Sequence, residues 1–241
     1  TTSPSSTSTP SPVAVTFDST ATARVRVKYA DVGKLTLNVR DAAATSVSGS
    51  GIFIVRPSTF VATSITDTAT TPNANPGASD ATGAKFVAAG SPFKVTVEAR
   101  NNCTTPAAVK NFGKESSPEG VKMDVALVSG LGLTDSPALA TVSDFSFSNG
   151  SGTATVNWPE VGIIKLTPRL KSGAYMGTSD VMGTQTGNVG RFYAHHFDTT
   201  VDTQGCGSFT YDRQPFGSVS VKAYANSGAT PLLNYRGSST A

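Results

Sequence analysis

The side chains of this sequence that could bind a metal ion are few and scattered. The only two histidines, His195 and His196, are adjacent, and adjacent residues of a β-strand point to opposite faces of the sheet. Both rings therefore cannot easily ligate one ion, which needs its donors on one side of the chain. The nearby acids Asp198 and Asp202 do not follow the spacing of a calcium-binding loop. We expect no metal site and no cofactor.

The residues that a hydrolase needs do not form a recognisable set either. Hydrolysis requires a nucleophile with a base, or two carboxylates held at a defined distance. The 241 residues include only 16 Asp and Glu, which are dispersed along the chain. No pair of acids therefore has a preferred geometry, and the serines lie mostly in segments typical of turns and linkers. We expect a protein that is not an enzyme.

Two cysteines, Cys103 and Cys206, are the remaining candidates for chemistry. Both lie in polar sequence, "NNCTT" and "QGCGS", which is not typical of thiols buried in a core. We expect a disulfide bond between Cys103 and Cys206 that joins the first strand of a module to its last strand, and therefore an oxidising compartment. Two free thiols are the alternative.

The elements that must position these residues are predicted to be strands. Charged residues make up only 15% of the chain, which contains 23 Gly and 14 Pro, a mixture that is typical of strands and turns. Segments such as "TARVRVKY" (22–29) and "FKVTVEAR" (93–100) alternate apolar and polar residues, the pattern of half-buried antiparallel strands. No segment shows convincing helical spacing, so we predict an all-β chain.

Charge and hydropathy exclude several classes of partner. The net charge of +3 comes from basic residues that occur singly along the predicted strands, and not from a basic stripe that could follow a phosphate backbone. We therefore expect no nucleic acid partner. No window of 18 or more apolar residues exists, so we expect no direct membrane span. Residues 1–12 lack the basic start and apolar centre of a signal peptide and resemble a Ser/Thr/Pro-rich linker.

An internal repeat accounts for the most specific pattern in the sequence. "YADVGKLTLNVR" and "WPEVGIIKLTPR" match at an offset of 129 residues, and "PFKVTVEAR" matches "PFGSVSVKAY" further along each copy. A weaker match pairs "VRPSTF" with "GRFYAHHF". Matching landmarks in one order indicate a repeat of about 120 to 130 residues, which suggests tandem immunoglobulin-like β-sandwich modules. The repeated positions that we expect to be structural are Tyr29, Gly33, Arg56, Trp158, Gly162 and Arg191.

Each repeated pair has an expected structural role. Tyr29 and Trp158 are predicted to anchor the core of a module, as large aromatic side chains do in β-sandwiches. The two glycines are predicted to mark a bulge or a close approach of the backbone where a strand begins. For the two arginines, hydrogen bonds to carbonyls at a sandwich end and ion pairs with Asp31 and Glu160 remain alternatives.

The repeat allows two ways of dividing the chain. One frame begins each module at the Val-Gly strand, and the other begins it at the Pro-Phe strand. The polar stretch "TATTPNANPGASDATG" is the most linker-like part of the chain, and it favours the second frame. We therefore predict a linker at 1–12, a partial module at 13–67, a linker at 68–84, a complete module at 85–206 and the first strands of a further module at 207–241.

Several segments together resemble a known family. "GRFYAHHFDTTV", "CGSFTYDRQPF", "LNYRG" and "EVGIIKLTPRLKSGAYMG" resemble the C-terminal region of MshQ-type MSHA pilus biogenesis proteins and related surface proteins. The similarity covers most of the range from Tyr29 to Gly237 and is densest from Trp158 onward, although Ala194 stands where the family has a proline. The resemblance implies a secreted or surface protein of a Gram-negative bacterium, linked to type IV pili. It implies no established activity for this region.

The predicted function is that of a non-catalytic extracellular stalk or adhesin fragment, which acts in display and subunit contact. Its expected partners are neighbouring subunits or other domains of the same surface protein. The incomplete modules at both ends would leave unpaired strand edges, so we expect them to dock on the central module or to be completed by β-strand addition. A carbohydrate-binding module that takes a surface glycan is the alternative, and it would need exposed aromatic side chains.

Overall fold

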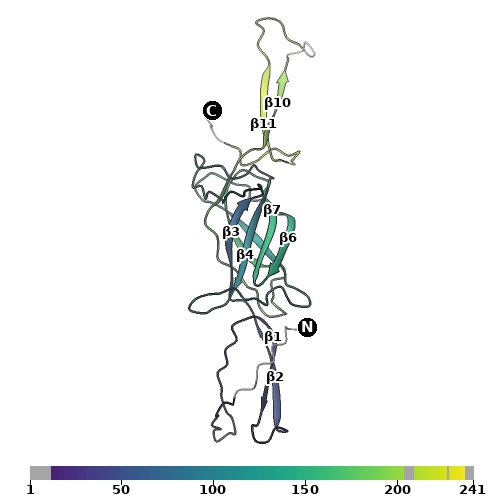
Figure 1. The fold of residues 1–241 in the computed structure, drawn as a ribbon. Helices are drawn as coiled ribbons and strands as arrows, with labels where there is room; N and C mark the ends of the chain where they lie inside the picture. The colour runs from purple at the N-terminus through teal and green to yellow at the C-terminus, as the bar shows by residue number, and fades with distance from the viewer. Residues whose placement is uncertain (1–11, 204–208, 227, 237–241) are drawn as a thin grey trace.

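The computed structural model describes residues 12–203, 209–226 and 228–236, which form strands and loops along one long axis (Figure 1). No helix occurs in this part of the chain, and hence none that could cross a membrane. The strands are β1 (Gly33–Arg40), β2 (Ser48–Val55), β3 (Thr59–Asp67), β4 (Pro92–Arg100), β5 (Val121–Leu127), β6 (Ala140–Ser148), β7 (Ser151–Asn157), β8 (Gly162–Leu170), β9 (Val189–Phe192), β10 (His196–Asp202) and β11 (Ser218–Tyr224).

A seven-stranded central sandwich, β3 to β9, forms the middle of the molecule. One sheet has the order β3-β4-β7-β6 and the other has the order β5-β8-β9, and neighbouring strands are antiparallel. When the strands are lettered A to G in chain order, the sheets are ABED and CFG, the arrangement of a constant-type immunoglobulin domain. The predicted all-β, immunoglobulin-like fold is therefore confirmed.

The core of the sandwich follows from the alternation in its strands. Phe93, Val95 and Val97 of β4 are fully buried, and Lys94 between them is exposed. Phe192 of β9 contacts three aromatic rings, with its centroid 5.4 Å from that of Phe93, 5.2 Å from that of Trp158 and 5.9 Å from that of Phe86. Such ring pairs add about 0.5 to 1.5 kcal/mol beyond the burial of their surface.

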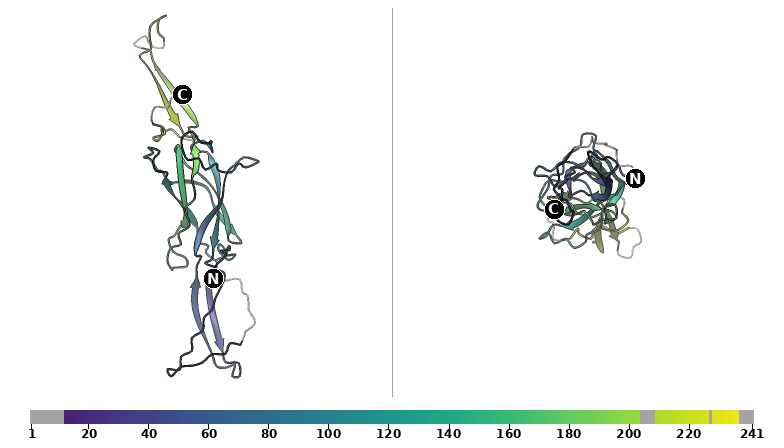
Figure 2. Two further views of the ribbon diagram at one scale, coloured as in Figure 1. Left: turned by 90° about the vertical axis from the view of Figure 1, so that its left-hand side faces the viewer. Right: turned by 90° about the horizontal axis from the view of Figure 1, so that it is seen from below.

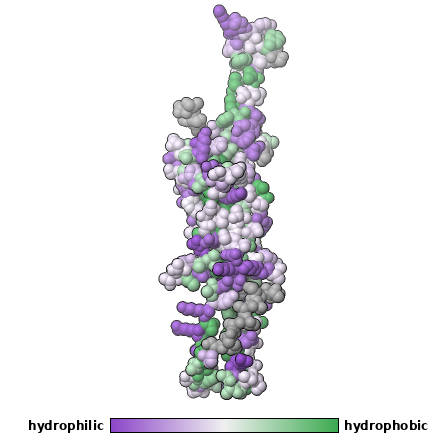
Figure 3. All heavy atoms as spheres, in the orientation of Figure 1, coloured by the Kyte–Doolittle hydropathy of each residue, from purple (hydrophilic) through white to green (hydrophobic). Residues whose placement is uncertain are grey.

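A hairpin projects from each end of the central sandwich, as the side view also shows (Figure 2). The N-terminal hairpin, β1–β2, pairs Gly33 with Val55 and Arg40 with Ser48. The C-terminal hairpin, β10–β11, forms another two-stranded sheet. Apolar side chains are exposed on both hairpins, and in Figure 3 they are visible as green atoms along the upper one. Within the described part of the chain, these apolar side chains are thus not covered by a second sheet.

The module boundaries differ from the predicted division by one strand at each end. We expected a complete module at 85–206, but the sandwich takes in β3 at its start and ends with β9. β10 belongs instead to the C-terminal hairpin, where it pairs with β11. The further module that we predicted to begin at 207 therefore begins one strand earlier, with β10. Of the linker predicted at 1–12, only the last residue lies within the described range.

The predicted linker at 68–84 is a loop inside the sandwich, because it connects two neighbouring strands of one sheet, β3 and β4. The Asp67 carboxylate accepts hydrogen bonds from the backbone and side-chain amides of Asn73, at 3.0 and 2.7 Å. The Asn75 side chain donates to the carbonyl of Asn188, at 2.8 Å. Polar residues that look like a linker thus anchor the loop through side-chain hydrogen bonds.

The disulfide predicted between Cys103 and Cys206 stays a prediction, because the structure describes only one of the two cysteines. Cys103 is a free, exposed thiol just after β4, at the end of the sandwich that contacts the N-terminal hairpin. Cys206 lies outside the described residues, three positions after Thr203, and β10 leads away from the sandwich at its opposite end.

The expected bridge between Cys103 and Cys206, and the oxidising compartment that it implies, therefore stay predictions. Sequence spacing placed both cysteines in one module, but the strand that leads to Cys206 belongs to the next one.

Candidate functional site: the junctions between modules

Two junctions connect the central sandwich to the hairpins, and they use equivalent positions of the repeat. In each, a short segment before a strand contacts the loop that follows the second strand of the next module. We call residues 29–33 and 109–112 the N-terminal junction, and residues 158–162 and 231–235 the C-terminal junction.

The N-terminal junction is held by the carboxylate of Asp31. One oxygen of this carboxylate accepts hydrogen bonds from the backbone N–H groups of Val32 and Asn111, at 2.9 and 3.0 Å. The Asn111 side chain in turn donates to the hydroxyl of Tyr29, at 3.3 Å. Val32 is 2% exposed and packs into the core of the central sandwich. The chain that enters β1 is therefore fixed to the next module by one apolar and several polar contacts.

In the C-terminal junction, Glu160 occupies the position of Asp31. Its side chain is buried, and its two carboxylate oxygens accept the backbone N–H groups of Val161 and Leu233, at 2.8 and 2.7 Å. Val161 is buried in a small apolar cluster with Ala89, Ala223, Ala225 and Leu232. The two oxygens of the buried Glu160 carboxylate thus connect the start of β8 to the segment after β11.

A second buried polar side chain, Asn234, closes the C-terminal junction. Its oxygen accepts the backbone N–H groups of Thr134 and Asp135, at 3.0 and 2.9 Å. Its amide donates to the carbonyl of Asp135, at 2.7 Å. The loop between β5 and β6 is therefore bound to the C-terminal hairpin as well. Because the Asn234 side chain is buried, these hydrogen bonds spare it the cost of unsatisfied polar atoms.

The two repeated glycines begin the strands that leave the junctions. Gly33 and Gly162 have positive φ angles of 138° and 132°, a region that L-residues with a side chain rarely adopt. A Cβ atom at Gly162 would lie 2.6 Å from the side chain of Leu133. The pairing of β8 with β9 also shifts register between Gly162 and Ile163. The structure thus places a bulge and a close approach at Gly162.

The two repeated aromatic residues differ in burial. Trp158 is 0% exposed, and its indole N–H donates to the carbonyl of Pro137, at 3.0 Å. Tyr29 is 40% exposed, so the expectation that it anchors a core is corrected. The strands that cover Trp158 belong to the central sandwich. Among the described residues, the N-terminal hairpin has no equivalents of most of these strands, so the Tyr29 ring stays partly exposed.

The two repeated arginines hydrogen-bond carbonyls, and not Asp31 or Glu160. Arg56 donates to the carbonyl of Asp180, at 2.9 Å, and Arg191 donates to the carbonyl of Gly83, at 3.0 Å. The first of the two alternatives for these residues therefore describes the structure.

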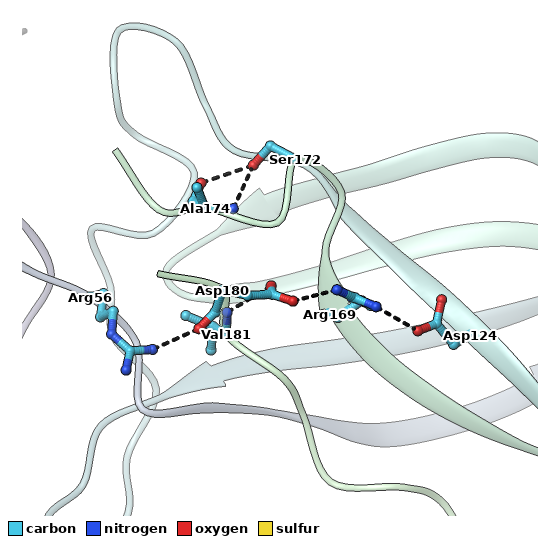
Figure 4. A network of polar contacts seen from close by, with 7 residues as sticks. All are labelled: Arg56, Asp124, Arg169, Ser172, Ala174, Asp180 and Val181. Carbon is cyan, nitrogen blue, oxygen red and sulfur yellow. Dashed lines mark hydrogen bonds and ion pairs between the residues drawn. The ribbon is translucent and has the colours of Figure 1, made fainter. Parts of the chain in front are cut away.

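Figure 4 shows the network that surrounds Arg56, which directly follows β2. Arg169 of β8 donates to the carboxylates of Asp180 and Asp124, at 2.5 and 3.3 Å. The hydrogen bond to Asp180 is the main reason why the pKa of Arg169 is raised. Asp180 therefore joins Arg56 and Arg169, and the base of the N-terminal hairpin is linked to the sandwich. Asp180 carries no sequence signal for this role, because its partners lie far apart in the chain.

The histidines lie at the base of the C-terminal hairpin. Their Nδ1 atoms are 3.1 Å apart, and the His196 ring stacks on Tyr224 with a centroid distance of 5.4 Å. The expected opposite orientation does not hold, because His195 precedes β10 and is not part of the strand. Among the described residues, no group of three or more His, Cys, Asp or Glu side chains could hold a metal ion. The junctions can hold modules together.

Comparison with known families gives three matches to one family of unknown function, DUF6701. Residues 1–52 match its first, immunoglobulin-like domain, residues 56–157 match its second domain, and residues 160–241 match its third domain. No curated protein and no solved structure matches the chain. The third match begins at Glu160, in the C-terminal junction, so β8 and β9 of the central sandwich lie within it.

Proposed function

Because the chain belongs to the DUF6701 family and consists of three tandem domains of it, we propose that it is a non-catalytic spacer in a surface stalk or adhesin. It holds consecutive immunoglobulin-like modules in line and presents them to neighbouring subunits. The observation that carries the proposal is the repeated junction. Asp31 and Glu160 occupy equivalent positions, and each accepts a hydrogen bond from one backbone N–H group of the next module.

The C-terminal junction is built to resist bending. If the hairpin moved away from the sandwich, the buried carboxylate of Glu160 would lose the N–H of Leu233. Leaving a buried charged group without its partner costs more than losing an ordinary hydrogen bond. The apolar cluster around Val161 would also become exposed to water. A connection of this kind transmits a pulling force along the axis of the modules.

The proposed setting is the exterior of a Gram-negative cell, as part of a protein linked to type IV, MSHA-like pili. Its support is the resemblance of segments such as "GRFYAHHFDTTV" to MshQ-type proteins, together with a fold that many cell-surface domains share. A glycan-binding module receives less support, since the single tryptophan, Trp158, is in the core. We therefore do not propose glycan binding.

Protease shaving of intact cells tests this location. In cells that express the full-length protein, externally added protease should cleave the protein within the loop at 68–84, while a periplasmic marker stays intact. Purified pilus preparations should contain the protein. Protection of this region in intact cells, with digestion after the outer membrane is opened, would contradict a surface location.

A further inference from the structure

β5 is the open edge of the central sandwich. The sandwich has four edge strands, β3 and β6 in one sheet and β5 and β9 in the other. Loops cover the outer edge of β3, where the carbonyl of Ile65 accepts the N–H of Asn75 at 2.8 Å. They also cover β9, where the carbonyl of Arg191 accepts the N–H of Phe86 at 2.9 Å. β6 has two irregularities in its register, and bulges of this kind protect an edge from further pairing. Within the described part of the chain, β5 alone has a regular edge without a cover.

The backbone groups of β5 point alternately toward β8 and toward the open edge. The two strands pair in unbroken register. Just beyond the ends of β5, the carbonyl of Gly120 accepts the N–H of Lys171 at 2.8 Å, and the N–H of Val128 donates to Ile163 at 3.1 Å. Because hydrogen-bonded pairs alternate along an antiparallel ladder, the even-numbered residues bond to β8. The odd-numbered residues, with Met123 near the middle, therefore direct their N–H and C=O groups to the outer edge.

The side chains of β5 divide in the same way between two faces. Met123 is 9% exposed and belongs to the core, whereas Lys122 and Asp124 lie on the outer face of the sheet. Lys122 lies directly opposite Arg169 of β8, and like charges in that position repel each other. Asp124 accepts a hydrogen bond from Arg169 at 3.3 Å, and Lys122 has no ion pair among the described residues. A strand added outside β5 could place an acid directly opposite Lys122.

We propose that a second copy of this chain adds to the open edge through its own β5. The two strands run antiparallel, with Met123 of one copy opposite Met123 of the other. The two three-stranded sheets then form one sheet of six strands. Because both copies use the same surface, the contact has two-fold symmetry and closes as a dimer. The inference deepens the proposed function, on which it rests for the biological role of the contact, since it identifies the surface through which neighbouring stalks meet side by side.

Charge determines the register of this pairing. With the two Met123 residues opposed, Lys122 of each copy lies directly opposite Asp124 of the other. This pair is of the non-hydrogen-bonded type, in which the Cα atoms are about 4.5 Å apart and the side chains are closest. A centre at Asp124 would oppose two aspartates, and a centre at Lys122 would oppose two lysines, both of which are unfavourable. The register centred on Met123 therefore forms two ion pairs and avoids repulsion.

A second copy fits this edge better than another part of the same chain. The strands of the sandwich run along the long axis of the molecule, and the adjoining hairpins lie beyond its two ends (Figures 1 and 2). The edge of β5 therefore faces sideways, away from the modules that precede and follow it. In the antiparallel direction the order Lys-Met-Asp of residues 122–124 becomes Asp-Met-Lys, so β5 is complementary in charge to itself. Its unpaired backbone groups also meet an identical set.

Disulfide trapping tests the register. All variants carry Cys103→Ser and Cys206→Ser, one carries Lys122→Cys in addition, and another carries Asp124→Cys. Mild oxidation of the mixture should give a covalent heterodimer, because directly opposed residues meet the distance requirement of a disulfide. Each variant alone is the matched control. Identical positions of the two copies would lie about 8 Å apart, beyond the limit of about 7 Å, so neither variant should form a covalent homodimer.

Association without a cross-link provides the second measurement. The mass of the full chain in light scattering should rise to twice the monomer mass over about a hundredfold range of concentration. Lys122→Asp should keep the chain monomeric, because it opposes two acids in each pair. This variant should still fold, since the new acid lies opposite Arg169. The matched control, Lys94→Asp, makes the same change of charge on the exposed face of β4 and should dimerise like the wild type.

Mixing two variants tests whether charge complementarity is the cause. Lys122→Asp and Asp124→Lys should each stay monomeric, and an equimolar mixture should form dimers, because every acid then lies opposite a lysine. A wild type that stays monomeric throughout, or a Lys122→Asp variant that dimerises like the wild type, overturns the proposal. A covalent homodimer of either single-cysteine variant overturns it as well, since the register would be different. Surface location, tested by protease shaving, succeeds or fails independently of these results.

Discussion

Replacing Glu160 by alanine should loosen the C-terminal junction without unfolding the central sandwich. The change removes both acceptors of a buried carboxylate, which receive the backbone N–H groups of Val161 and Leu233 at 2.8 and 2.7 Å. A hydrogen bond to a charged group contributes about 1.5 to 3 kcal/mol, and water can replace part of it once the side chain is gone. We therefore expect the free energy of local opening to fall by about 2 to 4 kcal/mol.

Hydrogen exchange measured by mass spectrometry provides the assay. A loss of about 2 to 4 kcal/mol corresponds to exchange that is about 30- to 900-fold faster in peptides that contain Leu233 and β11. Peptides from β4 and β7 should keep their protection, because those strands are held by the sheet and its core. The effect is thus local to one junction.

Asp212→Ala is the matched control for this experiment. It makes the same change of charge on the C-terminal hairpin, but the Asp212 side chain is 96% exposed. Exchange should therefore stay the same. Equal exchange in Glu160→Ala and Asp212→Ala would refute the reasoning, since it would mean that the buried carboxylate does not hold the junction. Faster exchange throughout β4 and β7 would refute it in another way, because Glu160 would then stabilise the sandwich itself.

Further predictions concern the core, the free thiol and the loop after β3. Trp158→Ala should lower the free energy of unfolding by about 3 to 5 kcal/mol in denaturant titration; a loss under about 1 kcal/mol would contradict its burial. Cys103 should react with iodoacetamide in the folded chain, since it is exposed; protection without denaturant would be evidence against this. Hydrogen bonds from Asn73 lower the pKa of Asp67. Their contribution to the stability of the folded loop is therefore fully present above the unfolded pKa of about 3.9, and it is lost as the pH falls through the lower folded pKa. Pepsin should therefore cleave the 68–84 loop of the wild type faster as the pH falls through this range. In Asp67→Asn, the cleavage rate should depend less on pH.

Local sequence determined the strands of this protein and the conformations at several turns. Alternation of apolar and polar residues needs only the period of a strand, so "FKVTVEAR" predicts β4 and its buried face without further information. The turn between β6 and β7 contains Asn149 and Gly150, both with positive φ, which is typical of a tight hairpin turn. Gly33 and Gly162 likewise identify one backbone conformation at two repeated positions. These features depend on neighbours along the chain.

Tertiary structure alone decided which strands share a sandwich and which side chains are buried. A polar segment has the same composition whether it links two modules or anchors a loop, so 68–84 could not be assigned from its residues. Tyr29 and Trp158 have equivalent sequence surroundings, yet one is 40% exposed and the other 0%. Burial depends on the strands that cover a residue, and those come from distant parts of the chain. The separation of Cys103 from β10 has the same cause, because the position of a strand along the axis is set by its sheet partners and not by its distance in sequence.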